Sequence, residues 1–274
     1  MGFVSDWKPE GDYSNLQLLR NGGAARIVLD RPEALNAWDK GLGDDLIDAI
    51  DKVGNDSSVR AVEIRGAGKA FSSGADLKAG FDHSTPEGRP DLERSLHDRY
   101  HPVIMGVRQM PKPVVAAVHG PAVGVSCALA LACDLVLASD EAYFLLAFAN
   151  IGLVPDGGAS LFIPARTGFS RAAEMAMLAE KIHGDKALEW GLVNKLVPQA
   201  EFDSAADELI NRLAAGPTKA YAGIKAQLNA QCFRGLEEHL ALEAKLQQEQ
   251  ANGTDFTEGV TAFLQRRKAN FTGE

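Results

Sequence analysis

Three short stretches carry residues whose types and spacing could do chemistry. Residues 151–158, IGLVPDGG, place the carboxylate of Asp156 between a proline and two glycines, just after an apolar run. Residues 124–128, GVSCA, come close to the turn that presents a serine nucleophile. Residues 66–74, GAGKAFSSG, follow an expected strand, as phosphate-binding loops do. The candidate chemistries are therefore a carboxylate base, a serine nucleophile and a nucleotide site.

The nucleotide and serine interpretations each lack a required residue. Phe71 stands at the third glycine of the dinucleotide pattern, and Ala70 stands where a Walker loop needs Ser or Thr. Ala128 replaces the closing glycine of the serine motif, and no Asp and His follow Ser126 in an obvious order. Both stretches nevertheless bring small residues to a turn, where two backbone N–H groups could converge on a developing oxyanion.

Asp156 also has a structural interpretation. Pro-Asp-Gly-Gly before the apolar Leu161–Ile163 reads as a helix start, and Asp is a favoured N-cap residue. One turn could combine both roles, since the backbone can be capped while the side chain is aimed at a ligand. The sequence alone leaves cap and base as alternatives.

The elements that must position these stretches alternate between strands and helices in the first half of the chain. Periodicity and β-branched composition predict strands over 16–19, 25–29, 62–65, 114–118 and 134–138. Helical periodicity predicts helices over about 41–53 and 92–107. This alternation indicates an α/β fold with ligands near strand ends and helix starts.

Helices dominate from about Phe169 onward, apart from a strand within 192–197. The predicted helices are 171–178, 202–213, 218–230, 236–250 and 258–268. We therefore divide the chain into an α/β core, residues 1–200, and a C-terminal helical subdomain, residues 201–274. Its Leu and Ala faces could pack on the core or on another subunit.

Composition excludes several classes of function. The net charge of -9 disfavours non-specific binding to nucleic acid or to anionic membranes, and any anionic ligand would need a local basic patch. The three cysteines show no metal-ligand spacing, so we expect no metal site and a reducing compartment. The N-terminus has no apolar signal core and no myristoylation pattern, which makes the cytoplasm the default location. The apolar segment 113–138 is broken by Pro121 and polar residues, so a strand, turn and helix are expected there rather than a membrane span.

Several motifs together resemble one known family. They are LDRPEALNA (29–37), AFSSGADLK (70–78), HGPAVG (119–124), ACDLVLA (132–138), IGLVP (151–155) and the closing GVTAFLQRRKANF (259–271). In order and spacing they resemble the crotonase (enoyl-CoA hydratase/isomerase) superfamily from about Leu16 to Phe271. The resemblance implies a core formed by a spiral of ββα turns, assembly as a homotrimer or a dimer of trimers, and a coenzyme A thioester as substrate, with no permanently bound cofactor.

The resemblance also assigns roles to individual positions. It implies an oxyanion hole made by the backbone N–H groups of Ala75 and Val125, the latter at a position that is more often glycine in the family. It places coenzyme A along Glu33, Ala34, Leu35 and Ser73, with Phe263 and Arg266 of the last helix meeting the adenine and phosphates. Residues 266–268, RRK, would supply the basic patch, although a solvated helix face is the alternative for those charges. The acyl pocket would include Phe81, Ala128 and Phe148.

The two glutamates by which family hydratases add water fall here on Ala128 and Phe148, which cannot transfer protons. Asp156 is the carboxylate that remains over the substrate. We therefore expect an enoyl-CoA isomerase that uses Asp156 as its single base, in a site whose dryness raises the pKa of that group. The alternatives are an enoyl-CoA hydratase, a non-catalytic acyl-CoA-binding protein and, last, a Ser126 hydrolase. Asp76 and Asp134 are expected to hold backbone, and His119 to pack.

Overall fold

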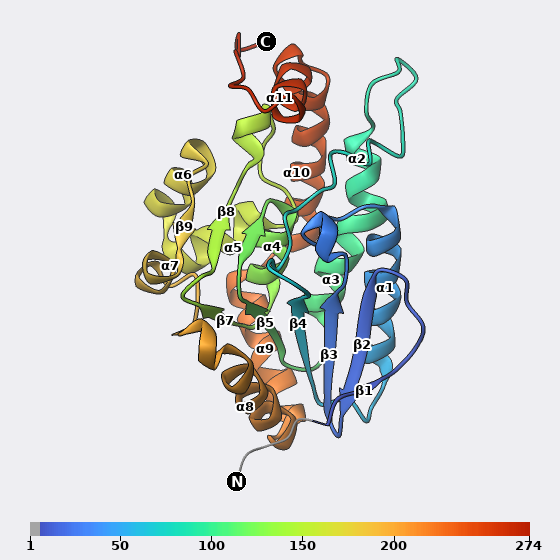
Figure 1. Cartoon of the computed structure of the whole chain (residues 1–274), viewed down its shortest axis with the longest axis vertical. Coiled ribbons are helices and arrows are strands. Elements are labelled where there is room, and N and C mark those ends of the chain that lie inside the picture. The colour runs from blue at the N-terminus through green and yellow to red at the C-terminus, as the bar shows by residue number, and fades with distance from the viewer. Residues whose placement is uncertain (1–5) are drawn as a thin grey trace.

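The large sheet has five parallel strands with an antiparallel hairpin at one edge (Figure 1). The computed structural model describes residues 6–274, so the first five residues of the stretch inspected for a signal sequence lie outside it. Strands β3, β4, β5, β7 and β10 are parallel, and β1, β2 and β3 are antiparallel. In sheet order, their bounds are β1 Lys8–Pro9, β2 Leu16–Asn21, β3 Ala24–Leu29, β4 Ala61–Gly66, β5 Val114–Val118, β7 Leu135–Ser139 and β10 Lys195–Val197. Apolar runs such as VVAAV form these strands because both faces of the sheet are covered.

A second, smaller sheet runs beside the first. It contains β6 (Pro121–Val123), β8 (Tyr143–Leu145) and β9 (Ile182–His183), and parallel bridges from Ser72 to Ala122 and from Trp38 to Ala75 extend it. Each of the strands β3, β4, β5 and β7 is thus followed by a short extended segment of this second layer and then by a helix. The expected spiral of ββα turns is confirmed. Sequence inspection missed β6, β8 and β9 because strands of two or three residues carry no periodicity.

Helices cover both faces of the large sheet. The main core cluster joins β2, β3 and β4 to the inner faces of α1 (Lys40–Asn55), α3 (His101–Gln109) and α4 (Val125–Ala132). On the other face, α8 (Phe202–Ala215) buries Phe202, Ala206 and Ile210 against β3, β4, β5 and β7. The segment 113–138 is the expected buried strand, turn and helix. None of the helices within residues 6–274 is both long and apolar enough to cross a membrane.

The predicted helix over 92–107 is continuous but not uniform. It contains α2 (Leu92–Ser95), a π-helical turn over Leu96–Tyr100, and α3. Such wide turns often occur at functional sites. Here the π-helical turn brings Leu96, Arg99 and Tyr100 to the wall of a cavity.

The remaining helices complete the molecule beyond the spiral. They are α5 (Ala159–Thr167), α6 (Phe169–Leu178), α7 (Gly184–Trp190), α9 (Thr218–Cys232), α10 (Leu236–Ala251) and α11 (Thr254–Leu264), with 3₁₀ turns at Pro32–Ala34 (η1), Phe148–Ile151 (η3) and Gln199–Glu201 (η4). Figure 1 shows α10 and α11 at the end of the molecule opposite α8. The prediction of a last helix over 258–268 is wrong in its bounds. The helix starts at Thr254, where the final residues fold back so that the Glu274 carbonyl accepts the Thr254 and Asp255 N–H groups, and it stops at Leu264, two residues before Arg266 adopts a φ of +55°.

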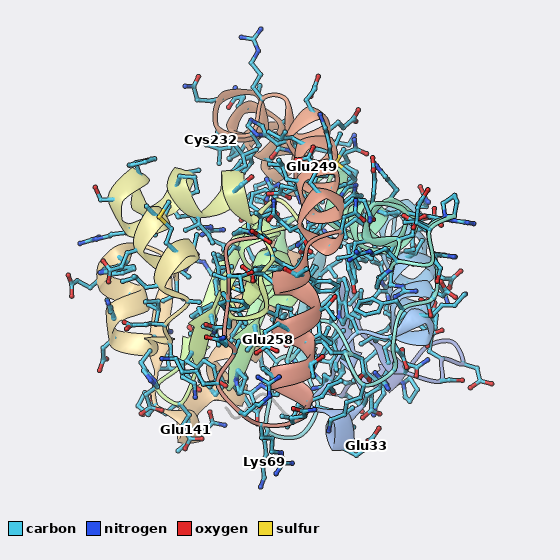
Figure 2. All side chains as sticks on the ribbon, turned by 90° about the horizontal axis from the view of Figure 1, so that it is seen from above. Glu33, Lys69, Glu141, Cys232, Glu249 and Glu258 are labelled. Carbon is cyan, nitrogen blue, oxygen red and sulfur yellow. The ribbon has the colours of Figure 1, made fainter. Side chains whose placement is uncertain are left out.

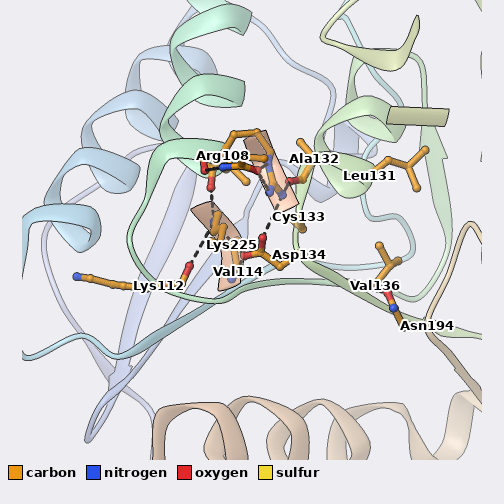
Figure 3. A network of polar contacts seen from close by, with 12 residues as sticks. Arg108, Lys112, Val114, Leu131, Ala132, Cys133, Asp134, Val136, Asn194 and Lys225 are labelled. Carbon is orange, nitrogen blue, oxygen red and sulfur yellow. Dashed lines mark hydrogen bonds and ion pairs between the residues drawn. The ribbon is translucent and has the colours of Figure 1, made fainter. Parts of the chain in front are cut away.

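A buried ionic network holds α9 against the sheet (Figure 3). Asp134 accepts the Val114 N–H at 2.8 Å and binds the guanidinium of Arg108 at 3.1 Å and the ammonium of Lys225 at 2.9 Å. Arg108 also donates from Nε to the side-chain Oδ1 atom of Asn229 on α9. The side chains of Arg108 and Lys225 are each about 5% exposed, so Asp134 is their principal compensating charge. The expectation that Asp134 holds strand backbone is confirmed.

We predict that Asp134→Asn lowers the free energy of unfolding by about 3–5 kcal/mol, because it leaves two buried cations uncompensated. Urea denaturation followed by circular dichroism measures the change. Asp44→Asn is the control, since its partner Lys40 is solvent-exposed and such pairs contribute about 0–1 kcal/mol. Equal losses in the two variants would contradict this account of the network.

Candidate active site

Two adjoining cavities lie between the spiral and the C-terminal helices. The larger cavity has a volume of about 330 Å³, and the smaller one has a volume of about 100 Å³. Both are lined by Ala75, Leu77, Tyr100, Phe148, Ile151 and Asp156. The walls are mostly apolar and aromatic, as is usual for small-molecule sites. The three stretches singled out in the sequence meet here, because Gly74, Val125 and Asp156 all line the larger cavity.

Two backbone N–H groups at the larger cavity have no acceptor within the described chain. Val125 is the first residue of α4, where a helical N–H lacks an intrahelical partner. Ala75 follows Gly74, whose φ is +86° and whose missing Cβ would lie 2.7 Å from the Val123 carbonyl oxygen. Only glycine permits this close approach, which brings the Ala75 segment against the strand that leads into α4. The geometry suits two donors aimed at one oxygen atom.

The carboxylate of Asp156 lies in the same cavity as these two donors. Its side chain is buried, with 5% of the residue exposed. The Oδ2 atom accepts a hydrogen bond from the Gln247 Nε2 atom at 3.0 Å, whereas Oδ1 is buried without a partner among the described residues. Burial raises the pKa of Asp156 well above its usual range, and the nearby carboxylate of Glu243 raises it further, whereas the Gln247 hydrogen bond lowers it. The net effect favours the protonated form of the carboxyl group, which makes Asp156 a candidate for proton transfer.

The N-cap interpretation of Asp156 is wrong. Helix α5 begins after Gly158, and no side chain from the preceding turn caps it. Instead, Glu243 of α10 accepts the N–H groups of Gly158 at 2.7 Å and of Ser160 at 3.0 Å. A carboxylate from another helix thus satisfies the start of α5. The Asp156 side chain therefore does not cap this helix.

The other carboxylates at the smaller cavity are already paired. Asp39 caps α1 through the Leu42 N–H and binds Arg31. Asp76 also binds Arg31 and accepts backbone N–H groups, as expected, and Asp82 binds Arg99. Among the described cavity-lining carboxylates, Asp156 alone forms no ion pair.

Some of the residues expected to hold coenzyme A lie near one another, and others do not. The Ser73 N–H donates to the Leu35 carbonyl at 3.0 Å, and the Ser73 hydroxyl to the Ala34 carbonyl at 3.4 Å, which fixes η1, the turn that contains Glu33, beside Ser73. Ser73 and Phe263 line the larger cavity. Arg266 follows the end of α11, lines neither cavity and has a φ of +55°. Its placement on the last helix was wrong.

Lys69 is a cation that sequence analysis did not assign to the ligand. It is exposed in the turn after β4. Figure 2 shows Lys69 and Glu33 pointing outward at the same edge of the molecule.

The residues expected in the acyl pocket differ in their placement. Phe148 lines both cavities, and Phe81 lines the smaller one. Ala128 lines neither, because it is fully buried behind the turn, where a Cβ on Gly157 would lie 3.1 Å from its methyl group.

Ser126 does not form a hydrolase triad. It is fully buried, and its hydroxyl lies 2.6 Å from that of Ser72. His183, a histidine that follows Ser126 in the sequence, packs on Tyr143, with 5.9 Å between ring centroids. His119, as expected, packs, here on Phe202, and bonds the Gly68 carbonyl.

Comparison with known proteins agrees with this geometry. The family model described as Enoyl-CoA hydratase/isomerase matches residues 20–274. The chain belongs to the enoyl-CoA hydratase/isomerase family. A probable enoyl-CoA hydratase of Rhodobacter capsulatus is 39% identical over 261 residues, which cover 95% of this chain and 99% of that protein. The 1,2-epoxyphenylacetyl-CoA isomerase of Escherichia coli is 34% identical over 92% of this chain and 96% of its own length. The crystal structure of an enoyl-CoA hydratase from Mycobacterium avium subsp. paratuberculosis superposes with a TM-score of 0.86, at 38% identity over 95% of this chain and all of that chain.

The crotonase resemblance is thereby confirmed, and the chain is an acyl-CoA enzyme of this family. The relatives bear both hydratase and isomerase names, so the family does not select the reaction. Three site residues of this family member escaped sequence analysis: Tyr100, Glu243 and Gln247. Burial and the neighbouring Asp156 raise the pKa of Tyr100 to about 12, so it remains a hydrogen-bond donor. Hydrophobic periodicity does not distinguish these three residues. The one available signal is that Glu243 and Gln247 are polar residues on the buried face of a helix. Residues 6–274 contain no group of His, Cys, Asp or Glu that could hold a metal ion.

We predict that Asp156→Asn stabilises the protein increasingly as pH rises. The folded-state pKa of Asp156 is raised, so its contribution to stability is present below the unfolded-state pKa and is lost as pH rises through the folded-state pKa. Asparagine does not titrate. The Tm of the variant should therefore match that of the parent near pH 4 and exceed it at pH 8.

Asp255→Asn is a control of opposite sign. Hydrogen bonds from Thr272 and Gly273 lower the pKa of Asp255, so this variant should lose stability at neutral pH. A Tm difference between Asp156→Asn and the parent that does not change with pH would contradict a raised Asp156 pKa.

Proposed function

We propose that this protein shifts a double bond in an enoyl-CoA, with Asp156 as the single base. The observation that carries the proposal is one buried carboxyl group that forms no ion pair and lies beside two free backbone N–H donors. The thioester carbonyl oxygen would accept hydrogen bonds from the N–H groups of Ala75 and Val125. These donors would stabilise the negative charge that develops on this oxygen when the α carbon loses a proton.

One carboxylate suffices for the whole reaction. Asp156 takes the α proton of a 3-enoyl-CoA, and the electron pair moves into a dienolate whose charge rests on the thioester oxygen. The carboxyl group then returns the same proton to the γ carbon, and the double bond becomes conjugated with the thioester. No water enters the balance. Because a single group handles the proton, we expect transfer on one face of the dienolate.

The cavity walls favour isomerisation over hydration. Hydration needs groups that hold a water molecule and a second group that delivers a proton. Phe148 lines both cavities at one of the positions where family hydratases carry a glutamate, and Ala128 at the other is buried out of reach. Phenylalanine would also keep water from the dienolate.

Coenzyme A would lie along η1 and Ser73, with Phe263 covering it. Phe263 is 55% exposed, which leaves its ring available to a base. Lys69 would replace part of the basic contribution expected from Arg266. We retain the homotrimer or dimer of trimers as a proposal, supported by the exposed Phe169, Met177 and Leu178 on α6, which another subunit could cover.

We predict that Asp156→Asn lowers kcat for a 3-enoyl-CoA by at least about 10³-fold, because the base is lost while the fold is kept. Formation of the conjugated thioester is followed by its ultraviolet absorbance. Deuterium at the α carbon should reappear at the γ carbon in the parent reaction. Undiminished isomerisation by the variant would refute the proposal. Loss of conjugated absorbance when the parent receives a 2-enoyl-CoA would identify a hydratase, and acyl-CoA binding without any turnover would identify a binding protein.

We predict that Val125→Pro lowers kcat by about 10²–10³-fold, because it removes one oxyanion donor. Proline is well tolerated at the first position of a helix, so the substitution deletes the N–H with little effect on α4. Val125→Ala keeps the N–H and is the matched control. Equal activity in the two variants would show that this donor does not contact the substrate.

A further inference from the structure

Helix α10 reaches the turn that carries Asp156 with two side chains placed one helical turn apart. Glu243 accepts the Gly158 and Ser160 N–H groups, as described above. Gln247 donates from Nε2 to the Val154 carbonyl at 2.6 Å and to Asp156 Oδ2 at 3.0 Å. The two residues are 3% and 1% exposed, respectively. The turn is therefore held on both sides of Asp156 by a helix that lies far away in the sequence.

The Val154 contact fixes the orientation of the Gln247 amide. A backbone carbonyl oxygen only accepts hydrogen bonds, so the amide nitrogen and not the amide oxygen must face it. The same nitrogen then presents its second N–H to Asp156 Oδ2. That oxygen must therefore be an acceptor in both protonation states of Asp156. A proton on the carboxyl group belongs on Oδ1.

Oδ1 is the oxygen that a substrate can use. It is buried and lacks a partner among the described residues, and Asp156 lines both cavities. We propose that Gln247 is a positioning residue that confines the exchanged proton to Asp156 Oδ1, and that Glu243 holds the turn that aims this oxygen at the substrate. This inference rests on Asp156 being the base, as proposed above.

The charges around Asp156 determine in which direction a change in either neighbour, Glu243 or Gln247, should shift its pKa. The groups that face it are Glu243 with His239 behind it on α10, Tyr100 and Arg99 on the π-helical turn, and Asp39, Lys40, Asp76 and Asp82 across the smaller cavity. Arg99, Asp39, Asp76 and Asp82 are held in ion pairs. Glu243 raises the pKa of Asp156, and the Gln247 hydrogen bond lowers it. Removing the two influences should therefore move the pKa in opposite directions.

The test is the pH profile of kcat/KM in matched variants. Gln247→Met keeps the length of the side chain but removes the donor, so the ascending limb should move to higher pH. On the ascending limb we expect kcat/KM to fall on the order of tenfold, with recovery toward the parent at high pH. Glu243→Gln removes the neighbouring negative charge, so the limb should move to lower pH. Gln250→Met, at an exposed position near the end of the same helix, should leave the profile unchanged.

A second measurement does not depend on turnover. The protonated carboxyl band of Asp156 can be assigned by its loss in Asp156→Asn and titrated by infrared difference spectroscopy in the substrate-free protein. The band should titrate at higher pH in Gln247→Met and at lower pH in Glu243→Gln. If enoyl-CoA is not turned over but the band shifts in this way, the isomerase proposal fails and the placement of the proton stands. Unchanged titration in Gln247→Met, or shifts in the same direction in both variants, would overturn the inference.

Discussion

The site depends on keeping one carboxyl group out of water and away from any cation. A buried carboxylate without a counter-ion is unfavourable, so Asp156 holds a proton more tightly than an exposed aspartate does. The fold prevents the usual compensations. Glu243 occupies the N–H groups at the start of α5 that would otherwise stabilise the Asp156 charge, and the nearby Arg99 is paired with Asp82. The uncompensated acid therefore holds its proton more tightly, which is the property that the proposed reaction would use.

The C-terminal helices are part of this arrangement and not an appendage. Helix α10 supplies Glu243 and Gln247 to the turn, and the neighbouring Gln248 accepts the N–H groups of Leu92 and Glu93 at the start of α2. Helix α11 packs on η3 so closely that a Cβ on Gly259 would lie 2.6 Å from the Ile151 backbone. Movement of these helices would therefore shift residues that line both cavities. The predicted division at residue 200 describes the sequence pattern, while the packing joins its two parts at the site.

The parallel sheet explains why the two free backbone N–H groups lie beside the acid. Each ββα turn delivers a short extended segment to the second sheet and then starts a helix, so consecutive turns stack similar junctions next to one another. Ala75 and Val125 occupy equivalent junctions in adjacent turns, and the turn after β8 leads to η3 and Asp156. Small residues at the first two junctions permit the close approach, as their composition indicated.

The sequence by itself determined the strands of the large sheet except β1, most helices and the family motifs, and it singled out Asp156, because apolar periodicity and turn composition are local properties. Small residues at turns indicated that backbone N–H groups could converge on a ligand, and the family resemblance supplied the positions Ala75 and Val125. It could not decide what Asp156 does within its turn. Pro-Asp-Gly-Gly is locally a good helix cap, and only the approach of α10 shows that Glu243 performs that role from 85 residues away. The start of α11 was likewise decided by tertiary packing, because the final residues of the chain fold back onto it. Tertiary packing settles such points because the competing hydrogen-bond partners are distant in sequence, and no local pattern records which of them will arrive.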